Sequence, residues 1–342
     1  MVNARITGIG SGLPEFVLSN SDLVKWHGHR DPQWIEERFG IRERRSCYDV
    51  LRGEHVTDEH LLCVDAGKEA LEEAGLTADR LDALVLLTNS PMHVVFPDPA
   101  CRLHDALGMT ERAQALTVTA GCAGTLNGLL MAHAYISSEL ASSVLVVTAS
   151  SALSAYAQPH LRERMWLFAS IFGDGASALV VQAGRDDDTG LCPPFQWGTD
   201  AENDVAHTRF GGSAEPVTPA NADEAAWDHP EFDFRKVPGN LDSVFTRLYE
   251  EARDAPLLDG GPPDWVLFNM SNGPTQRRWL QEQGIPAERS HFNIESVGNC
   301  GAASLGLLLH DFIRERHPQP GDLALLMSVG TGLQYASAFY RF

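Results

Sequence analysis

One cysteine of this chain stands in a setting that could make its thiol reactive. Cys122 lies in the segment TVTAGCAGT (residues 117–125), between an apolar run and a long helical pattern. A strand, a tight turn of small residues and a helix place a thiol at a helix N-terminus, where unpaired N–H groups and the helix dipole favour the thiolate. A thiolate held in this way is a nucleophile for thioesters. The alternative interpretation is a small, buried and unreactive residue.

The remaining cysteines and histidines suggest neither a metal site nor disulfides. The six cysteines are scattered without a CxxC pair, and the thirteen histidines contain no HExxH-like cluster. In a chain of this length without secretory features, such cysteines are typical of free thiols. We therefore expect no metal site.

The charge and the hydropathy pattern exclude several classes of protein. A formal net charge of −20 argues against a nucleic-acid-binding protein and against docking on an anionic membrane, because both need a basic face. The first residues lack the layout of a signal peptide, and no apolar run approaches ~20 residues. We expect a cytoplasmic globular protein whose 342 residues bury a sizeable core.

Helical and strand patterns alternate along the chain, which predicts α/β layers. In the first half we expect helices over residues 58–75, 98–107 and 123–139, and strands over 82–88, 113–119 and 143–148. In the second half we expect helices over 241–253 and 275–284, a third helix that follows a tight turn at 298–301 and ends at residue 314, and strands over 264–270, 322–329 and 334–342. Residues 184–222 are polar and rich in Gly, Pro and Asp, which is typical of a connecting loop.

The second half repeats the order of the first, which indicates an internal duplication. GLLMAH (residues 128–133) matches GLLLH (residues 306–310), and this register places Cys122 opposite Cys300. We expect two halves, residues 1–183 with the nucleophile and residues 184–342. Matching turns of two such halves meet at a seam, which is a favourable place for an active site. Cys300 itself is expected to serve packing.

Several motifs in order resemble one known family almost from end to end. They are ITGIGSGLP (6–14), WIEERFGIRER (34–44), AGCAG (120–124), FGDGA (172–176), GNCGAAS (298–304) and GTG (330–332). Together they resemble β-ketoacyl-acyl-carrier-protein synthase III, a ketosynthase III-like family within the thiolase-like superfamily. One such motif would be a weak signal, whereas the whole series in order is specific.

The resemblance implies a fold, a substrate class and a set of roles. The fold would be a thiolase fold with duplicated halves in a five-layered α-β-α-β-α sandwich, usually a homodimer. An acyl-CoA or the phosphopantetheine thioester of an acyl carrier protein would acylate Cys122, with no permanently bound cofactor. The N–H groups of Cys122, Thr331 and Gly332 would form an oxyanion hole. Phe96 would reach across the dimer into the acyl pocket of the partner.

The catalytic residues of the family are Cys, His and Asn, and this chain departs from that set. Cys122 and Asn299 match, but Asn269 stands where the family has its histidine, in DWVLFNMSN (264–272). A carboxamide can donate a hydrogen bond but cannot exchange a proton. A hydroxyl or amine acceptor needs a general base. We hypothesise that His207 is a substitute base, with His160 a weaker candidate; the alternative is a solvated loop histidine.

The donor site also departs from the family. The resemblance implies that Trp34, Arg38 and Trp166 bind CoA or pantetheine, although Trp166 stands in place of an arginine. Two tryptophans could sandwich an adenine ring. Arg42, Arg44 and Arg45 could form a basic patch for an acidic carrier protein, or simply a solvated face.

Three hypotheses follow. The first is a ketosynthase III-like acyltransferase that passes the acyl group from Cys122 to a small-molecule or carrier-bound acceptor, in polyketide or other specialised metabolism. The second is a decarboxylative β-ketoacyl synthase that condenses with malonyl-carrier protein and uses Asn269 and Asn299 as donors. The third is a non-catalytic dimer partner, which the intact Cys122 turn disfavours.

Overall fold

The computed structural model describes residues 3–90, 98–184, 189–199, 206–232 and 237–342. The first of its two main sheets has five strands in the spatial order β1, β9, β8, β6, β7. In chain order these are β1 (Ala4–Gly12), β6 (Ala83–Thr88), β7 (Gln114–Thr119), β8 (Ser143–Ser150) and β9 (Gly175–Ala183). β6 is parallel to β7 and β8, whereas β9 is antiparallel to β8 and β1.

The second sheet has four strands in the order β10, β15, β14, β13. In chain order they are β10 (Gly190–Thr199), β13 (Trp265–Phe268), β14 (Leu323–Val329) and β15 (Gln334–Arg341). This order, with two antiparallel pairs followed by a parallel pair, repeats the order β1, β9, β8, β6 of the first sheet. The repeat supports an internal duplication, while a division at residue 183 remains a prediction.

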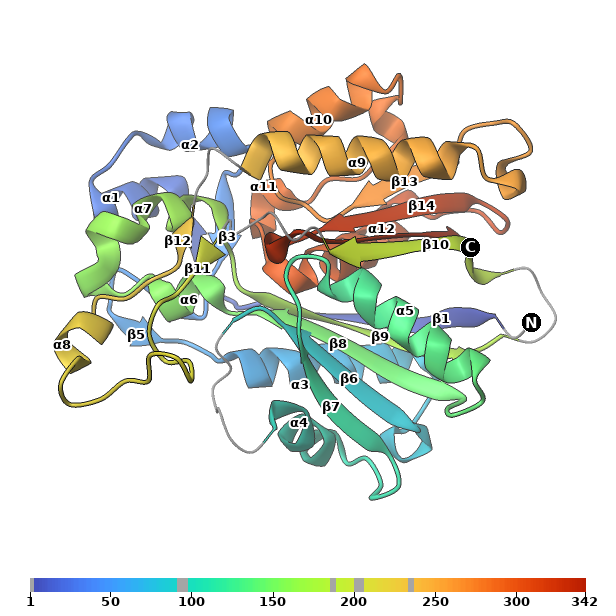
Figure 1. The fold of residues 1–342 in the computed structure, drawn as a ribbon, viewed down its shortest axis with the longest axis horizontal. Helices are drawn as coiled ribbons and strands as arrows, with labels where there is room; N and C mark the ends of the chain where they lie inside the picture. The colour runs from blue at the N-terminus through green and yellow to red at the C-terminus, as the bar shows by residue number, and fades with distance from the viewer. Residues whose placement is uncertain (1–2, 91–97, 185–188, 200–205, 233–236) are drawn as a thin grey trace.

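Helices form three layers around the two sheets (Figure 1). α3 (Glu59–Ala74) and α4 (Pro99–Leu107) pack on the outer face of the first sheet. α5 (Gly124–Ser137) and α12 (Ser304–Arg316) lie between the sheets and contact both. α9 (Val237–Arg253) covers the far face of the second sheet, with α10 (Gly273–Glu282) beside it. The predicted five-layered fold is therefore confirmed.

Shorter elements gather at one end of the two sheets, at the left of Figure 1. The helices there are α1 (Asn20–His27), α2 (Pro32–Phe39), α6 (Ala152–Tyr156), α7 (Arg162–Ile171) and α8 (Ala222–Ala225). The short strands are β2 (Val17–Ser19), β3 (Glu43–Arg45), β4 (Tyr48–Asp49), β5 (Glu54–His55), β11 (Ala206–His207) and β12 (Glu231–Phe232). α11 (Ile294–Val297) packs against β3.

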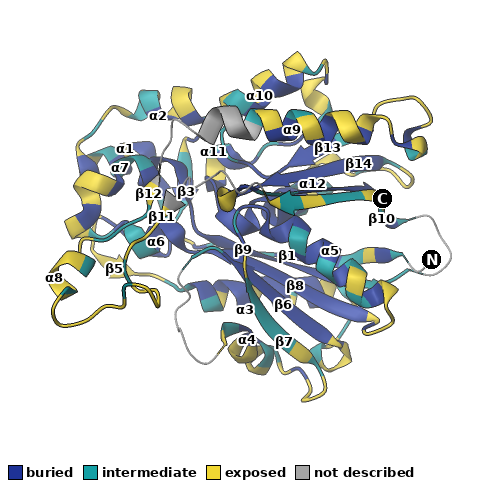
Figure 2. Cartoon of the chain, in the orientation of Figure 1, coloured by how far each residue is buried: buried dark blue, intermediate teal, exposed yellow. Residues whose placement is uncertain are grey.

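Burial explains which strands the sequence predicted well. Every residue of β6, β8 and β14 is buried, because helices cover both faces of these inner strands (Figure 2). Such strands are nearly continuous apolar runs. β7 is an edge strand and is only half-buried. All predicted helices and strands are present, with boundaries shifted by a few residues.

The expectation that residues 184–222 form a connecting loop is wrong in part. β10 lies within this segment and pairs antiparallel with β15 at the edge of the second sheet. The pairing shifts register between Cys192 and Gln196, where two prolines stand. An edge strand tolerates proline at such an irregularity, because the missing N–H faces no neighbour. Because prolines are rare within strands, the same two residues give this strand the sequence pattern of a loop.

The repeated glycines of the two central helices have a packing function. A Cβ at Gly128 of α5 would lie 2.5 Å from Val146 of β8. A Cβ at Gly306 of α12 would lie 1.9 Å from the Ser177 hydroxyl of β9. Between the helices, the hydroxyl of Thr125 donates to the carbonyl of Ala302 (2.8 Å). Close packing in the middle layer brings the two turns that precede these helices together.

Candidate active site

Cys122 lies in a turn between β7 and α5, two residues before the helix begins. The backbone N–H of Ala120 donates to the carbonyl of Thr88 (2.9 Å), which fixes the chain as it leaves the sheet. The Cys122 side chain is only 8% exposed, and this burial raises the pKa of the thiol to about 11. Its own N–H, the Asn299 side chain and the Thr331 backbone act in the opposite direction. Burial therefore opposes the thiolate that the turn geometry is expected to favour.

Asn299 presents its amide to the sulfur of Cys122 because its oxygen is already engaged. Asn299 Oδ1 accepts hydrogen bonds from the backbone N–H of Gly301 (2.9 Å) and the hydroxyl of Ser304 (3.1 Å). Its backbone pairs with the FGDGA motif, since the N–H of Gly173 donates to the Asn299 carbonyl (3.0 Å). The structure thus brings the predicted residues Cys122 and Asn299 together.

The Thr331 turn packs directly on the Cys122 turn. A Cβ at Gly330 would lie 2.6 Å from the Cys122 nitrogen, and a Cβ at Gly121 would lie 3.1 Å from the Thr331 nitrogen. The contact at Gly330 excludes any side chain, and the one at Gly121 is tight for a Cβ. The backbone of Thr331 therefore reaches the sulfur, as expected for an oxyanion hole. A role of Gly332 in the same hole remains a prediction.

Asn269 is held by the end of the neighbouring strand. Its side chain is 0% exposed and lies just after β13. Asn269 Nδ2 donates to the carbonyl of Val329 (3.1 Å), and Oδ1 accepts from the N–H of the same residue (2.9 Å). The hydroxyl of Ser328 lies 3.3 Å from Oδ1 and 3.1 Å from the carbonyl oxygen of Cys122. Asn269 is therefore next to the site but engaged in backbone contacts.

Trp34 and Trp166 meet at the surface, but they leave no room for a ring between them. Their ring centroids are 6.0 Å apart and the planes are tilted by 48°. A sandwiched ring needs about 7 Å, twice a carbon contact of ~3.5 Å. The guanidinium of Arg30 lies 5.0 Å from the Trp34 ring and 5.9 Å from the Trp166 ring, and His29 stacks on Trp166. Sequence reasoning missed Arg30, although it stands four residues before Trp34.

Arg38, His207 and His160 lie on elements other than the turns that hold the thiol. Arg38 is exposed at the end of α2. His207 is exposed on β11, where it pairs with Glu231 of β12. His160 bonds through Nε2 to the carbonyl of Ala226 (2.9 Å). The expected acyl-pocket residue Phe96 lies outside the described residues, so its role stays a prediction.

The proposed basic patch is wrong for one of its three members. Arg44 is completely buried, and its guanidinium donates to carbonyls of Leu18 (3.2 Å) and Ser170 (2.9 Å). Burial lowers its pKa to about 9. Arg44 therefore links two backbone segments in the interior and cannot dock a carrier protein. Cys300 is also fully buried, in agreement with the expected packing role.

A buried carboxyl group close to the sheet end was missed by sequence reasoning. Glu59, the first residue of α3, is 2% exposed and accepts hydrogen bonds from hydroxyls of Thr88 (3.0 Å), Ser90 (3.2 Å) and Ser151. Burial raises its pKa to about 7 despite these donors. A glutamate at the start of a helix is normally solvated, so no sequence signal distinguishes this one.

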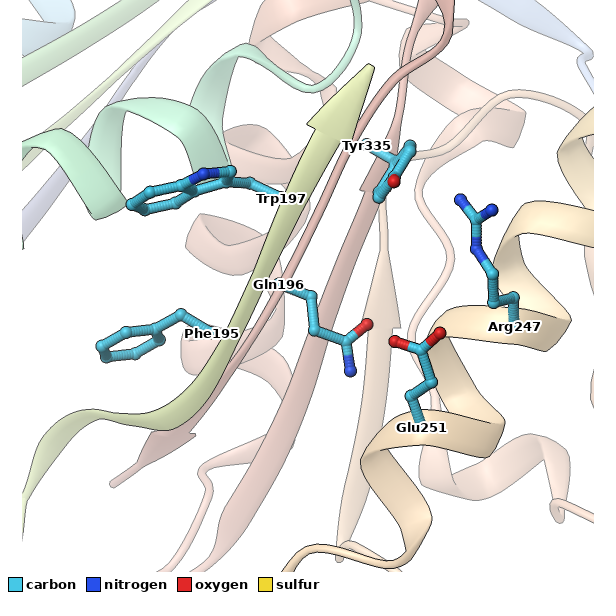
Figure 3. Close-up of a pocket in the computed structure, with 6 residues that line it drawn as sticks. All are labelled: Phe195, Gln196, Trp197, Arg247, Glu251 and Tyr335. Atoms are coloured by element: carbon cyan, nitrogen blue, oxygen red, sulfur yellow. The ribbon is translucent and has the colours of Figure 1, made fainter. Parts of the chain in front are cut away.

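One surface pocket of about 320 Å³ lies away from Cys122 (Figure 3). Residues of β10, α9 and β15 line it, among them Trp197, Arg247 and Tyr335. Arg247 and Glu251 are both exposed, so this is an open polar groove. Among the described ranges we find no group of side chains suited to a metal ion. The helices of those ranges include none with the length and apolar character needed to span a bilayer.

Comparison with known proteins places this chain in a family. Profiles of 3-oxoacyl-[acyl-carrier-protein] synthase III match residues 116–201, and those of its C-terminal region match residues 261–342. The chain is 33% identical to β-ketoacyl-[acyl-carrier-protein] synthase III 3 of Streptomyces coelicolor, covering 97% of this chain and 95% of that one.

Solved structures agree with this placement. The 3-oxoacyl-(acyl carrier protein) synthase III of Pseudomonas aeruginosa superposes with a TM-score of 0.82 at 28% identity, covering 99% and 98% of the two chains. The priming β-ketosynthase of the R1128 polyketide pathway gives a TM-score of 0.82 at 25% identity, covering 99% and 96%. The chain belongs to the β-ketoacyl-[acyl-carrier-protein] synthase III family of the thiolase superfamily.

Proposed function

We propose that this protein is a ketosynthase III-like acyltransferase that loads an acyl group onto Cys122 and passes it to an acceptor. The donor is an acyl-CoA or the phosphopantetheine thioester of an acyl carrier protein. The observation that carries the proposal is the convergence of three donors on one sulfur: the N–H of Cys122, the Thr331 backbone and the Asn299 amide. Donors in this arrangement stabilise the negative charge that develops in acyl transfer.

Acylation at this site is a thioester exchange. The sulfur of Cys122 bonds to the carbonyl carbon of the donor, and the bond from that carbon to the donor's sulfur breaks. The proton that leaves Cys122 ends on the departing thiol, so the step is balanced without a permanently charged base. The buried thiol of pKa about 11 becomes nucleophilic only as its proton is withdrawn.

The acceptor that suits the site best is another thiol, such as the phosphopantetheine of a carrier protein. A thiol acceptor reverses the loading step and needs no strong general base, since free thiols have a pKa of about 8.5. A hydroxyl or amine acceptor needs a base. The carboxamide of Asn269 cannot serve as one, and it is bound to Val329.

Decarboxylative condensation is the second candidate, because the relatives are named β-ketoacyl synthases. It would require donors for a developing enolate oxygen. Asn299 directs its amide at the sulfur of Cys122, whereas Oδ1 and one N–H of Asn269 bind Val329, which leaves Asn269 a single N–H for this role. The likeness to a polyketide priming enzyme supports a place in polyketide or other specialised metabolism.

Intact-mass analysis with a panel of acyl-CoAs and malonyl-carrier protein tests the proposal. We expect an adduct on Cys122 that is lost when a carrier protein with a free pantetheine thiol is added, without carbon dioxide release. Carbon dioxide together with a β-ketoacyl product would establish condensation. If no adduct forms and Cys122→Ala behaves as wild type, the hypothesis of a non-catalytic dimer partner is favoured instead. Cys101→Ala is the matched control, because Cys101 is the exposed cysteine among the described residues.

A further inference from the structure

The carboxamide of Asn269 is matched to the backbone of a single residue. Its donor and its acceptor bond to the C=O and the N–H of Val329, at 3.1 Å and 2.9 Å. This two-point contact fixes the orientation of the amide, because a flipped group would oppose N–H to N–H and O to O. The parallel register of β13 and β14, with Phe268 opposite Met327, brings Asn269 to this place.

The segment that Asn269 holds leads directly to the reactive sulfur. Val329 is followed by Gly330 and then by Thr331, whose backbone acts on the Cys122 thiol. The preceding residue, Ser328, lies within hydrogen-bond distance of both Asn269 Oδ1 and the Cys122 carbonyl. Its hydroxyl has one proton to donate, and the Cys122 carbonyl is the nearer acceptor at 3.1 Å. Asn269, the Thr331 turn and the Cys122 turn are thus one hydrogen-bonded unit.

We infer that Asn269 is a positioning residue for acyl transfer: its carboxamide anchors the segment from Ser328 to Thr331 against the Cys122 turn. In this role it aims the Thr331 N–H at the sulfur and at the carbonyl oxygen of a bound thioester. The inference rests on the proposed acylation of Cys122. It assigns Asn269 a different task from the proton-exchanging histidine that the family has at this position.

An imidazole could not replace this contact. A carboxamide presents its N–H and its oxygen side by side, which matches the N–H and C=O of one peptide residue. The two ring nitrogens of histidine point in divergent directions, so one ring cannot bond to both groups of Val329. The Asn269 side chain is completely buried, which leaves no solvent to replace a lost bond.

The test compares Asn269→Ala with Asn293→Ala. Asn293 is a matched control, since it is a buried amide of the same half whose Nδ2 bonds to Asp311 (2.9 Å), away from both turns. With acetyl-CoA as donor and intact mass as readout, we expect Asn269→Ala to slow the maximal acylation rate at least tenfold. The half-saturating acetyl-CoA concentration should stay within twofold, and the control should keep wild-type values for both.

A second measurement does not depend on the donor. The pH midpoint for alkylation of Cys122 by iodoacetamide should rise in Asn269→Ala, because a misplaced Thr331 N–H no longer stabilises the thiolate. The groups that act on this thiol are the uncharged donors of Cys122, Asn299 and Thr331, so the midpoint reports on them. An unchanged midpoint and acylation rate in Asn269→Ala would overturn the inference.

Two further outcomes are distinguishable. If Asn269→Ala does not fold, Ser328→Ala removes only the hydroxyl that ties the same segment to the Cys122 carbonyl, and it should lower both the alkylation rate and the acylation rate about threefold. Wild-type rates in that variant would also contradict the inference. If wild type itself forms no adduct with any acyl donor, the proposed function fails, and the alkylation midpoint alone decides the role of Asn269.

Discussion

Burial and hydrogen bonding act in opposite directions on the Cys122 thiol. A pKa of about 11 means that forming the thiolate at pH 7 costs ~5 kcal/mol in the free protein. The same N–H groups of Cys122 and Thr331 are available to a thioester oxygen once a donor binds.

The buried carboxyl group of Glu59 makes the folded protein less stable as the pH rises, which is the reverse of the usual effect of a carboxyl group. Its pKa is raised by burial from 4.5 to about 7, so the folded state favours the protonated carboxyl group. The associated stabilisation is complete below about pH 4.5 and is lost as the pH rises through about 7. We expect Glu59→Gln to raise the free energy of unfolding at pH 8 by up to ~3 kcal/mol, with the gain shrinking toward pH 4.5.

Denaturant unfolding of both proteins between pH 4.5 and 8 measures this difference. Glu72→Gln is the control, since Glu72 is exposed on the same helix and should change nothing. Asp174 is also buried, and burial raises its pKa to about 6. Because Asp174 titrates in both proteins, its contribution to the difference in their unfolding free energies largely cancels. A variant that is less stable than wild type at pH 8 would show that Glu59 is held ionised by its three hydroxyl donors.

At the scale of elements, the sequence is informative where burial on both faces dictates the residues. β6 and β8 are buried throughout and mostly apolar, and the sequence predicts them, whereas it does not predict the proline-containing edge strand β10. The cysteine turn and the Asn299 motif were also predicted. The contact between Asn269 and Val329 was not, because it depends on the register of β13 against β14 and not on any local pattern. Glu59 was not predicted because its burial depends on tertiary packing, whereas Arg30 stands only four residues before Trp34 and was overlooked.

The contact between the two catalytic turns predicts a strong effect of one methyl group. Gly330 has an ordinary backbone φ of −127°, yet a Cβ there would lie 2.6 Å from the Cys122 nitrogen and 3.0 Å from the Ala123 nitrogen. We expect Gly330→Ala to push the turns apart and to lower the rate of Cys122 acylation at least tenfold. Gly212→Ala is the control, because nothing lies near that position. Equal acylation rates in intact-mass assays would contradict the close contact.

The arginine over the two tryptophans predicts a change in donor preference. Arg30 must leave the ring faces, and the rings of Trp34 and Trp166 must move apart from 6.0 Å, before they can admit an adenine. A cation on an aromatic face is worth about 0.5–2 kcal/mol. We expect Arg30→Ala to lower the half-saturating concentration of acetyl-CoA by ~2- to 30-fold. Acetyl-pantetheine, which lacks the adenine, should be unaffected. An increase in the half-saturating concentration of acetyl-CoA would instead indicate that Arg30 binds the nucleotide phosphates.

At the scale of the whole molecule, the first sheet ends in a strand that is open on one side. β7 is half-buried and pairs only with β6 in the described structure. An unpaired edge is a template for another strand, and proteins normally cover it. A second copy of this chain, as in the homodimer that the family resemblance implies, would extend the sheet across a twofold axis.

Backbone directions along β7 allow a specific test of that dimer. The N–H of Thr117 donates to the Asp98 carboxylate (3.3 Å), so it points away from β6. In a strand every second residue shares this direction, which places the Ala115 N–H at the open edge as well. Ala115→Pro should therefore spare the pairing with β6 and remove a hydrogen bond to the partner. Light scattering should give twice the 37.3 kDa of one chain for wild type and a concentration-dependent shift toward one chain for Ala115→Pro. A variant that keeps the wild-type dimer at every concentration would place the interface on another surface, and a monomeric wild type would exclude it.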